Sequence, residues 1–151
     1  QLLERILKEF IPVYTRGDSA ETERGNYITR KVYLANTGNW EEYSTLVEST
    51  MSSTFPGNDD FLRGEAYELV NEYSRDQGAL DLAYEWAQRI VKINQEFDNL
   101  LLLAYMQGMK SELVQARETA DLMRGMELNE EQVNILKELD NIIEQAGSAQ
   151  E

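Results

Sequence analysis

Two neighbouring stretches decide the fold: residues 61–94, FLRGEAYELVNEYSRDQGALDLAYEWAQRIVKIN, and residues 97–124, FDNLLLLAYMQGMKSELVQARETADLMR. In each stretch a short apolar helix is expected to end near a glycine, Gly78 or Gly108, and a second helix turns back on it. A helical hairpin of this kind buries its apolar face by stacking on a neighbouring hairpin. No segment alternates at the strand period of two. The sequence therefore predicts an all-α fold, a right-handed stack of antiparallel helical hairpins with about 7–8 helices and no sheet.

The rest of the sequence extends this pattern, and we expect a single helical-repeat domain over residues 1–151. Apolar residues recur at helical spacing in residues 2–15, where Pro12 is expected to kink the helix or end it early. Residues 16–25 are polar and are expected to form a loop or a partly helical segment. Helical spacing begins at the first residues without an initiator Met, so we expect a fragment of a longer protein. The expected units are hairpins over 26–53, 60–94 and 97–124 and a capping helix over 129–146.

Polar residues at three places predict helix starts. Asn39 is expected to cap the helix that follows it, and Asp59 or Asp60 to cap the helix after the Pro-Gly break. Asn129 and Gln132 have the spacing of a capping box, in which each side chain bonds the backbone N–H of the other. We therefore expect a well-defined start for the last helix, which Gly147 is expected to end.

The expected core follows from the helical spacing of apolar residues. The helix over 97–107 is apolar almost all round, so it is expected to be the buried centre of the stack. In the helix expected over 26–36, the side chains expected to be buried are those of Ile28, Val32 and Ala35. The later helices are expected to bury Leu62, Ala66, Leu69, Val70, Tyr73, Leu80, Ala83, Ala87, Ile90, Val91, Leu113, Ala116, Ala120, Met123, Val133, Leu136, Leu139 and Ile143.

The composition excludes several classes of function. The chain has 14 basic and 28 acidic residues, a formal net charge of −14, and would repel nucleic acid or an anionic membrane surface. It contains no cysteine and no histidine, which excludes thiolate nucleophiles, His-based triads and the usual zinc sites. We therefore expect no catalytic residues, no cofactor, no metal site and no enzyme activity in this chain. No segment approaches the roughly 20 apolar residues that a membrane-spanning helix needs, so no membrane insertion is expected.

Three glycines set the register of the expected repeat. Gly38, Gly78 and Gly108 are spaced 40 and 30 residues apart, and each is expected to lie at the turn of a hairpin. The tetratricopeptide (TPR) repeat has a period near 34 residues. The chain therefore resembles a degenerate TPR-like helical repeat.

The central stretch also contains three helix-packing motifs: Leu80-x-x-Ala83-x-x-Trp86-Ala87, Leu103-Ala104 to Gly108, and Ala116-x-x-x-Ala120. In this order they resemble the TPR-like helical region that follows the thioredoxin domain in many secreted thioredoxin-family proteins of Bacteroidetes. The resemblance covers less than half of the chain. It implies that a redox domain lies upstream of Gln1, that this chain is its accessory domain, and that the protein is periplasmic or exported.

Aromatic side chains are the candidates for contact with a partner. Amphipathic rings suit peptide recognition, although the same helical spacing is typical of core packing. The function that we expect is a non-catalytic protein-interaction or scaffold domain, with a protein or peptide partner that is basic because the chain is acidic. The alternative is a carbohydrate- or peptide-binding module that uses exposed aromatic and carboxylate side chains. The sequence does not predict the oligomeric state. The candidate partner-binding residues are Trp40, Tyr67, Tyr73, Tyr84 and Tyr105.

Overall fold

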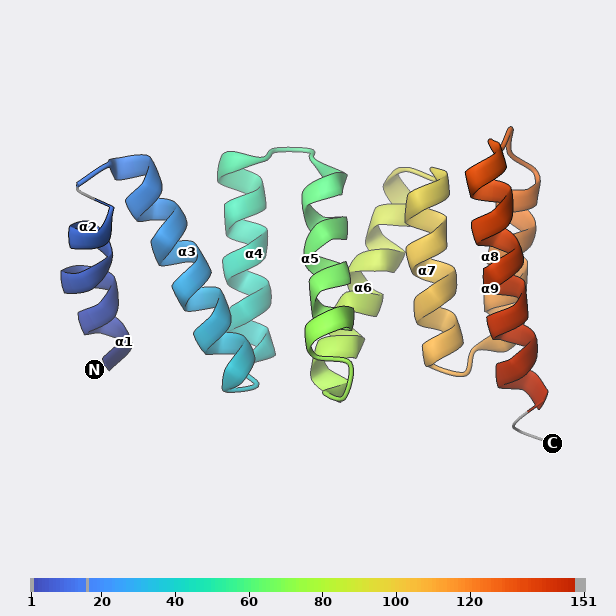
Figure 1. Cartoon of the computed structure of the whole chain (residues 1–151), viewed down its shortest axis with the longest axis horizontal. Coiled ribbons are helices and arrows are strands. Elements are labelled where there is room, and N and C mark those ends of the chain that lie inside the picture. The colour runs from blue at the N-terminus through green and yellow to red at the C-terminus, as the bar shows by residue number, and fades with distance from the viewer. Residues whose placement is uncertain (1, 16, 149–151) are drawn as a thin grey trace. The chain divides into compact units, whose positions relative to one another are not determined.

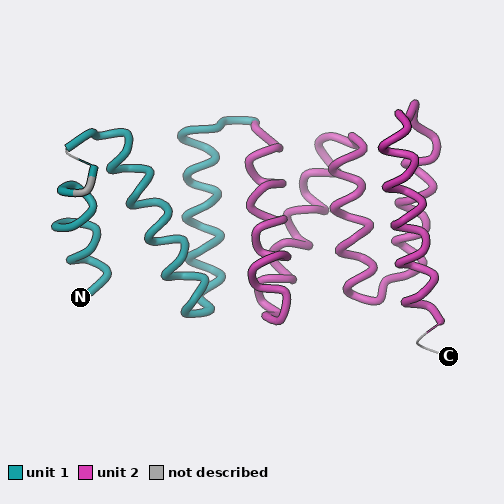
Figure 2. The backbone as a smooth tube through the Cα atoms, viewed as in Figure 1, with its two compact units in different colours: residues 1–57 teal, residues 58–151 magenta. Residues whose placement is uncertain are grey.

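The computed structural model describes residues 2–15 and 17–148 and is all-α, as the sequence predicts (Figure 1). Every regular element among the described residues is a helix, and none is a strand. The chain forms two compact units, residues 1–57 and residues 58–151 (Figure 2). The boundary along the chain follows the sequence Phe55-Pro56-Gly57.

Unit 1 begins with a continuous helix that changes pitch near Pro12. Proline has no backbone N–H, so a regular α-helix that contains it lacks one backbone hydrogen bond. Here the preceding turn is a wider π-helix, in which the N–H of Ile11 bonds the carbonyl of Ile6, and the helix continues past the proline. The helices of unit 1 are α1 (Leu2–Arg5), the π-helix η1 (Ile6–Phe10), α2 (Ile11–Tyr14), α3 (Ser19–Asn36) and α4 (Trp40–Thr54).

Helix α3 starts seven residues earlier than the predicted start of the 26–53 hairpin. Asp18 caps it, because its side chain accepts a hydrogen bond from the N–H of Glu21 at 2.9 Å. Of the two predictions for residues 16–25, the partly helical one is therefore correct over the described residues; Arg16 lies outside them. Gly25 is inside the helix, where a Cβ atom would lie 2.8 Å from Cγ2 of Ile11. The glycine allows α2 and α3 to approach each other closely.

The buried face of α3 differs from the predicted one. Ala35 is buried as expected, but Ile28 and Val32 are each 45% exposed, so their predicted burial is wrong. The side chains that α3 buries are those of Lys31, Leu34 and Ala35, toward the end of the helix. The spacing of the apolar residues correctly predicted a helix here. It did not predict which residues are buried, because α3 buries side chains along only a short part of its length.

Unit 2 is a stack of hairpins in two layers. Each helix packs on the next one in the chain, α5 also contacts α7, and α7 also contacts α9. In Figure 1, α5, α7 and α9 lie in front and α6 and α8 lie behind them; we call these the front layer and the back layer. The helices are α5 (Asp59–Glu72), α6 (Gln77–Ile93), α7 (Phe97–Met109), α8 (Leu113–Arg124) and α9 (Glu130–Ser148).

Two of the predicted caps are confirmed. The side chain of Asn39 accepts from the N–H of Glu42 at 3.4 Å at the start of α4. At the start of α9, Asn129 and Gln132 bond each other's backbone N–H groups at 2.9 and 3.1 Å, which is a capping box.

Other predicted helix ends are wrong by a few residues. Asn58, and neither Asp59 nor Asp60, caps α5 by accepting from the N–H of Phe61 at 3.2 Å. Helix α9 continues through Gly147 to Ser148, so this glycine does not end it.

The predicted role of two glycines also fails. Gly38 lies at a turn with φ of +67°, but Gly78 lies in the first turn of α6, which Asp76 caps, and Gly108 lies in the last turn of α7. The turn after α7 is made by Ser111, with φ of +61°. These two glycines therefore do not set the ends of the helices, and the start of α6 is set by the Asp76 cap.

Helix α7 is the centre of the core of unit 2, as predicted. It buries eight of its 13 residues. The alanines expected at helix interfaces, Ala83, Ala87, Ala116 and Ala120, are all fully buried, and their small side chains let neighbouring helices approach closely. Two predicted core residues, Leu80 and Leu113, are only partly buried, and Val133 is 37% exposed.

Candidate interaction surface

The outer side of α7 forms the middle of the front layer. Residues three or four apart lie on one side of a helix, and the residues of α7 that are not buried recur at this spacing. Tyr105 and Met109 are each 38% exposed, and Leu101 is partly buried. We call Leu101, Tyr105 and Met109 the α7 stripe. It is an apolar strip of helix surface that no other described helix of unit 2 covers completely.

The structure separates the five predicted partner-binding residues. Tyr67 on α5 and Tyr105 on α7 belong to the front layer, whereas Tyr84 is on α6 in the back layer. Tyr73 follows the last residue of α5 as its C-cap and is partly buried. Trp40 opens α4 in unit 1, where its ring meets that of Tyr43 edge-on at 5.6 Å. Only Tyr67 and Tyr105 therefore share a layer in which they can contribute to one surface.

Tyr67 lies on the side of α5 that approaches α7. Burial of its hydroxyl and the nearby carboxylate of Asp98 raise the pKa of Tyr67, and the guanidinium of Arg63 partly opposes this shift. Tyr67 is therefore a neutral hydrogen-bonding group at ordinary pH, next to the start of α7.

Tyr84 is engaged in contacts within the chain. Its hydroxyl donates a hydrogen bond to the carboxylate of Glu112, and Nζ of Lys110 lies 5.3 Å from the centre of its ring. Burial and the hydrogen bond with Glu112 raise the pKa of Tyr84. Lys110 also bonds Asp81 on α6 and, together with a hydrogen bond from Gln77, lowers the pKa of Asp81. These contacts hold α6 against the turn between α7 and α8.

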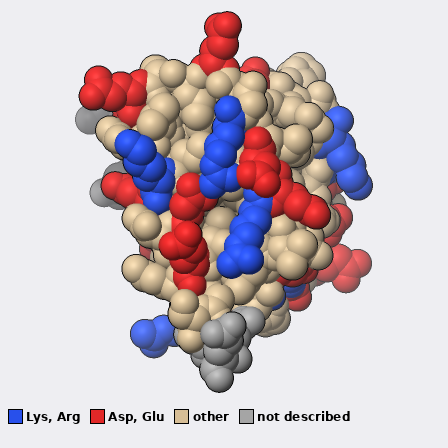
Figure 3. All heavy atoms as spheres, turned by 90° about the vertical axis from the view of Figure 1, so that its right-hand side faces the viewer, with Lys and Arg blue, Asp and Glu red and all other residues tan. Residues whose placement is uncertain are grey.

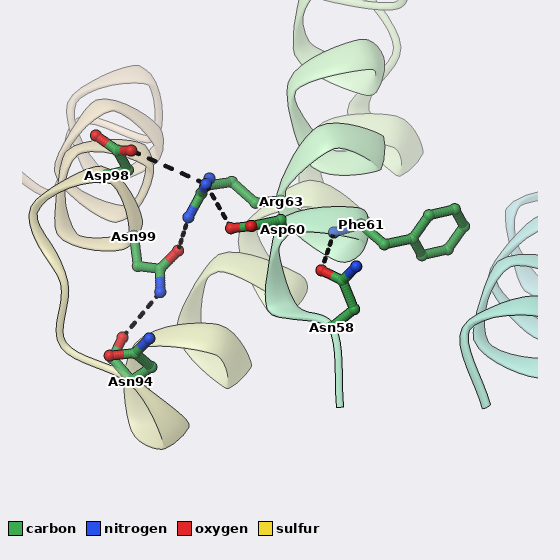
Figure 4. Close-up of polar contacts among 7 residues, drawn as sticks. All are labelled: Asn58, Asp60, Phe61, Arg63, Asn94, Asp98 and Asn99. Carbon is green, nitrogen blue, oxygen red and sulfur yellow. Dashed lines mark hydrogen bonds and ion pairs between the residues drawn. The ribbon is translucent and has the colours of Figure 1, made fainter. Parts of the chain in front are cut away.

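A polar cluster at the start of α7 was not predicted from the sequence (Figure 4). Arg63 on α5 donates to Oδ1 of Asn99 at 2.8 Å and to Asp60 at 2.6 Å, and lies 3.9 Å from Asp98. Asn99, only 1% exposed, also donates to the carbonyl of Asn94 at 3.0 Å. The cluster ties α5, the end of α6 and the start of α7 together. Its only signal in the sequence is an asparagine among the leucines of an apolar helix.

A second buried polar pair joins α7 to α8. The hydroxyl of Thr119 donates to Oε1 of Gln107 at 2.8 Å, and both residues are buried. Because buried polar groups without partners are costly, this pair favours a single register between the two helices.

The end of unit 2 formed by α8 and α9 carries charges of both signs side by side (Figure 3). Arg124 on α8 bonds Asp121 on its own helix and Asp140 on α9. Solvated ion pairs of this kind contribute little stability. They give the last hairpin a polar outer surface, as expected for the terminal helices of a stack.

The described residues contain no cluster of side chains typical of a metal site. No group of three or more acidic side chains among them is placed to hold a metal ion. An open depression of about 690 Å³ lies between the start of α8 and the end of α9, and its lining includes Glu112, Arg117 and Glu144. None of the five candidate aromatic residues lines it. Within the described part of the chain, no helix has the length and apolar character to cross a membrane.

Comparison of the chain with protein-family models, with curated proteins and with solved structures gave no match. Support for a function therefore comes from the surface of the fold and from the resemblance found in the sequence.

Proposed function

We propose that this chain is a non-catalytic protein-interaction domain and that the front layer of unit 2 is its contact surface. The observation that carries the proposal is the α7 stripe. It exposes apolar side chains at the centre of a rigid helical layer, where a partner can bury them. A surface on packed helices also binds with little loss of conformational freedom.

The polar residues of unit 2 support a structural role rather than a catalytic one. The polar side chains of Arg63, Asn99, Tyr84 and Lys110 are bonded to other residues of the chain. Trp86 is fully buried and cannot stack on a sugar. This arrangement favours an interaction domain over the alternative of a carbohydrate-binding module.

We further propose that the domain is accessory to an upstream thioredoxin-like domain in an exported protein. The support is the resemblance of its motifs around Trp86, Gly108 and Ala116 to the helical region of such proteins. Sequencing the gene upstream of the codon for Gln1 tests this part directly. A signal peptide followed by a Trp-Cys-x-x-Cys domain is expected, and an unrelated domain there would refute the accessory role.

Site-specific photo-cross-linking tests the contact surface. A photoreactive phenylalanine analogue replaces Tyr105 in the front layer or, as the control, Glu85 on the exposed side of α6. In cells that naturally make the protein, we expect a discrete cross-linked product from position 105 and none from position 85. If no front-layer position gives a product, the proposed contact surface is wrong.

A further inference from the structure

The two layers of unit 2 differ sharply in charge. Helices α5, α7 and α9 of the front layer contain eleven acidic and two basic residues, a net charge of −9. Helices α6 and α8 of the back layer contain four acidic and four basic residues, a net charge of zero. Of these eleven acidic side chains, Glu65 is buried and Asp140 bonds Arg124 of α8, so the exposed excess is smaller than the count. Most of the acidic excess of unit 2 is still carried by the helices of the front layer.

The acidic residues of the front layer lie on either side of an apolar centre. Helix α7 has Asp98 as its only charged residue, and its outward side is the α7 stripe. On α9, Glu131, Asn134, Glu138 and Asn141 recur every three or four residues, and all four are exposed. They form a polar and acidic strip along one side of that helix. On α5, the exposed acidic residues are Asp60 and Glu72.

The two basic residues of the front layer neutralise only part of its acidic charge. Arg63 bonds Asp60 and Asn99 and lies near Asp98, and its side chain is only 17% exposed. Lys137 is exposed on α9 and directly precedes Glu138 in the sequence. An approaching ligand therefore meets an excess of negative charge around an apolar strip.

We propose that the front layer of unit 2 binds a lysine- or arginine-rich protein segment that also carries apolar or aromatic side chains. The proposal rests on the proposed function and names the chemistry of the partner. The basic groups pair with the carboxylates of α5 and α9, and an apolar side chain packs on Leu101 and Tyr105 of the α7 stripe. Cationic groups also interact favourably with the face of the Tyr105 ring. Charge complementarity of this kind speeds association and excludes acidic partners.

Fluorescence anisotropy with defined peptides tests the proposal. The probe is a fluorescein-labelled peptide, Lys-Lys-Leu-Phe-Lys-Lys-Leu-Lys, added to the full chain. We expect binding that weakens by about tenfold or more between roughly 30 mM and 300 mM NaCl. The same peptide with glutamate for lysine should not bind, and the peptide with alanine for leucine and phenylalanine should bind more weakly. Equal binding of the acidic peptide would overturn the proposal.

Charge-reversed variants locate the site. The double variant Glu131→Lys/Glu138→Lys changes the front layer, and Glu85→Lys/Glu118→Lys makes the same change in net charge on exposed positions of the back layer. We expect the front variant to weaken binding of the basic peptide about tenfold or more and the back variant less than about threefold. Equal effects would mean that the peptide responds only to net charge, which would overturn the proposal.

A matched apolar pair tests the α7 stripe. Tyr105→Ala should weaken binding, whereas Leu122→Ala, a change at a 54% exposed residue of α8, should not. Equal melting temperatures exclude unfolding as the cause. If the basic peptide fails to bind while position 105 still gives a cross-link, the proposed basic partner is wrong and the proposed contact surface stands. If the peptide fails to bind and position 105 gives no cross-link, the basic partner and the contact surface are both wrong.

Discussion

At the scale of single residues, Asn99 holds the start of α7 in place. Its amide accepts from Arg63 of α5 and donates to the carbonyl of Asn94, and it is 1% exposed. Replacing it with alanine removes both bonds and leaves the part-buried carbonyl of Asn94 without this partner, so Asn99→Ala should lower the free energy of unfolding by about 1–3 kcal/mol. Urea denaturation measures this change. The control Asn134→Ala, at an exposed position of α9, should change stability by less than about 0.5 kcal/mol.

Ala120 tests the interface between the hairpins. It is fully buried on α8, so Ala120→Glu forces a carboxylate among apolar side chains and should cost about 3 kcal/mol or more. Gln115→Glu places the same charge on an exposed position of the same helix and should have little effect. Thermal denaturation of the two variants compares them. Similar melting temperatures would show that the α8 interface is placed incorrectly.

Replacing two glycines with alanine is expected to change stability in opposite directions. Gly38 has φ of +67°, a conformation that disfavours side chains, so Gly38→Ala should destabilise unit 1 by about 1 kcal/mol. Gly64 is inside α5, and a Cβ there would meet no atom within 4 Å, so Gly64→Ala should stabilise unit 2 by about 0.5–1 kcal/mol. Chemical denaturation gives both signs. A stabilising Gly38→Ala would contradict the turn conformation.

At the scale of the elements, α9 depends on its capping box. Asn129→Ala removes the acceptor of the Gln132 N–H and should lower stability by about 1 kcal/mol. Hydrogen exchange should show the loss first in the amides of the opening turn of α9. Glu130→Ala, at the exposed next position, is the control and should leave these amides protected. Equal protection in both variants would mean that the box does not hold the helix start.

Helix type and helix interfaces could be predicted from the sequence, but helix ends only partly. Apolar spacing correctly gave α7 as the buried centre and Ala83, Ala87, Ala116 and Ala120 as interface residues. Gly78 was misplaced because a glycine inside a helix costs only about 1 kcal/mol, and the Asp76 cap outweighs it. The Arg63–Asn99 contact joins residues 36 positions apart, so no local pattern could reveal it.

At the scale of the whole molecule, the two-layer order of unit 2 decides on which side of the unit the acidic charge of its helices gathers. The sequence gives the net charge of −14 but not the side of the fold that carries it. Packing places α5, α7 and α9 in one layer, and these helices hold most of the acidic excess. The same order separates Tyr67 and Tyr105 from Tyr84, which their spacing in the sequence could not predict.

The central claim is that the front layer of unit 2 is the contact surface of this protein. The most direct test is a nuclear magnetic resonance titration of the ¹⁵N-labelled chain with the basic Leu–Phe peptide. We expect the largest shifts in the amide signals of α7 around Leu101 and Tyr105 and of the facing sides of α5 and α9. Shifts that concentrate in α6 and α8, or no shifts at the low-salt end of the titration, would contradict it.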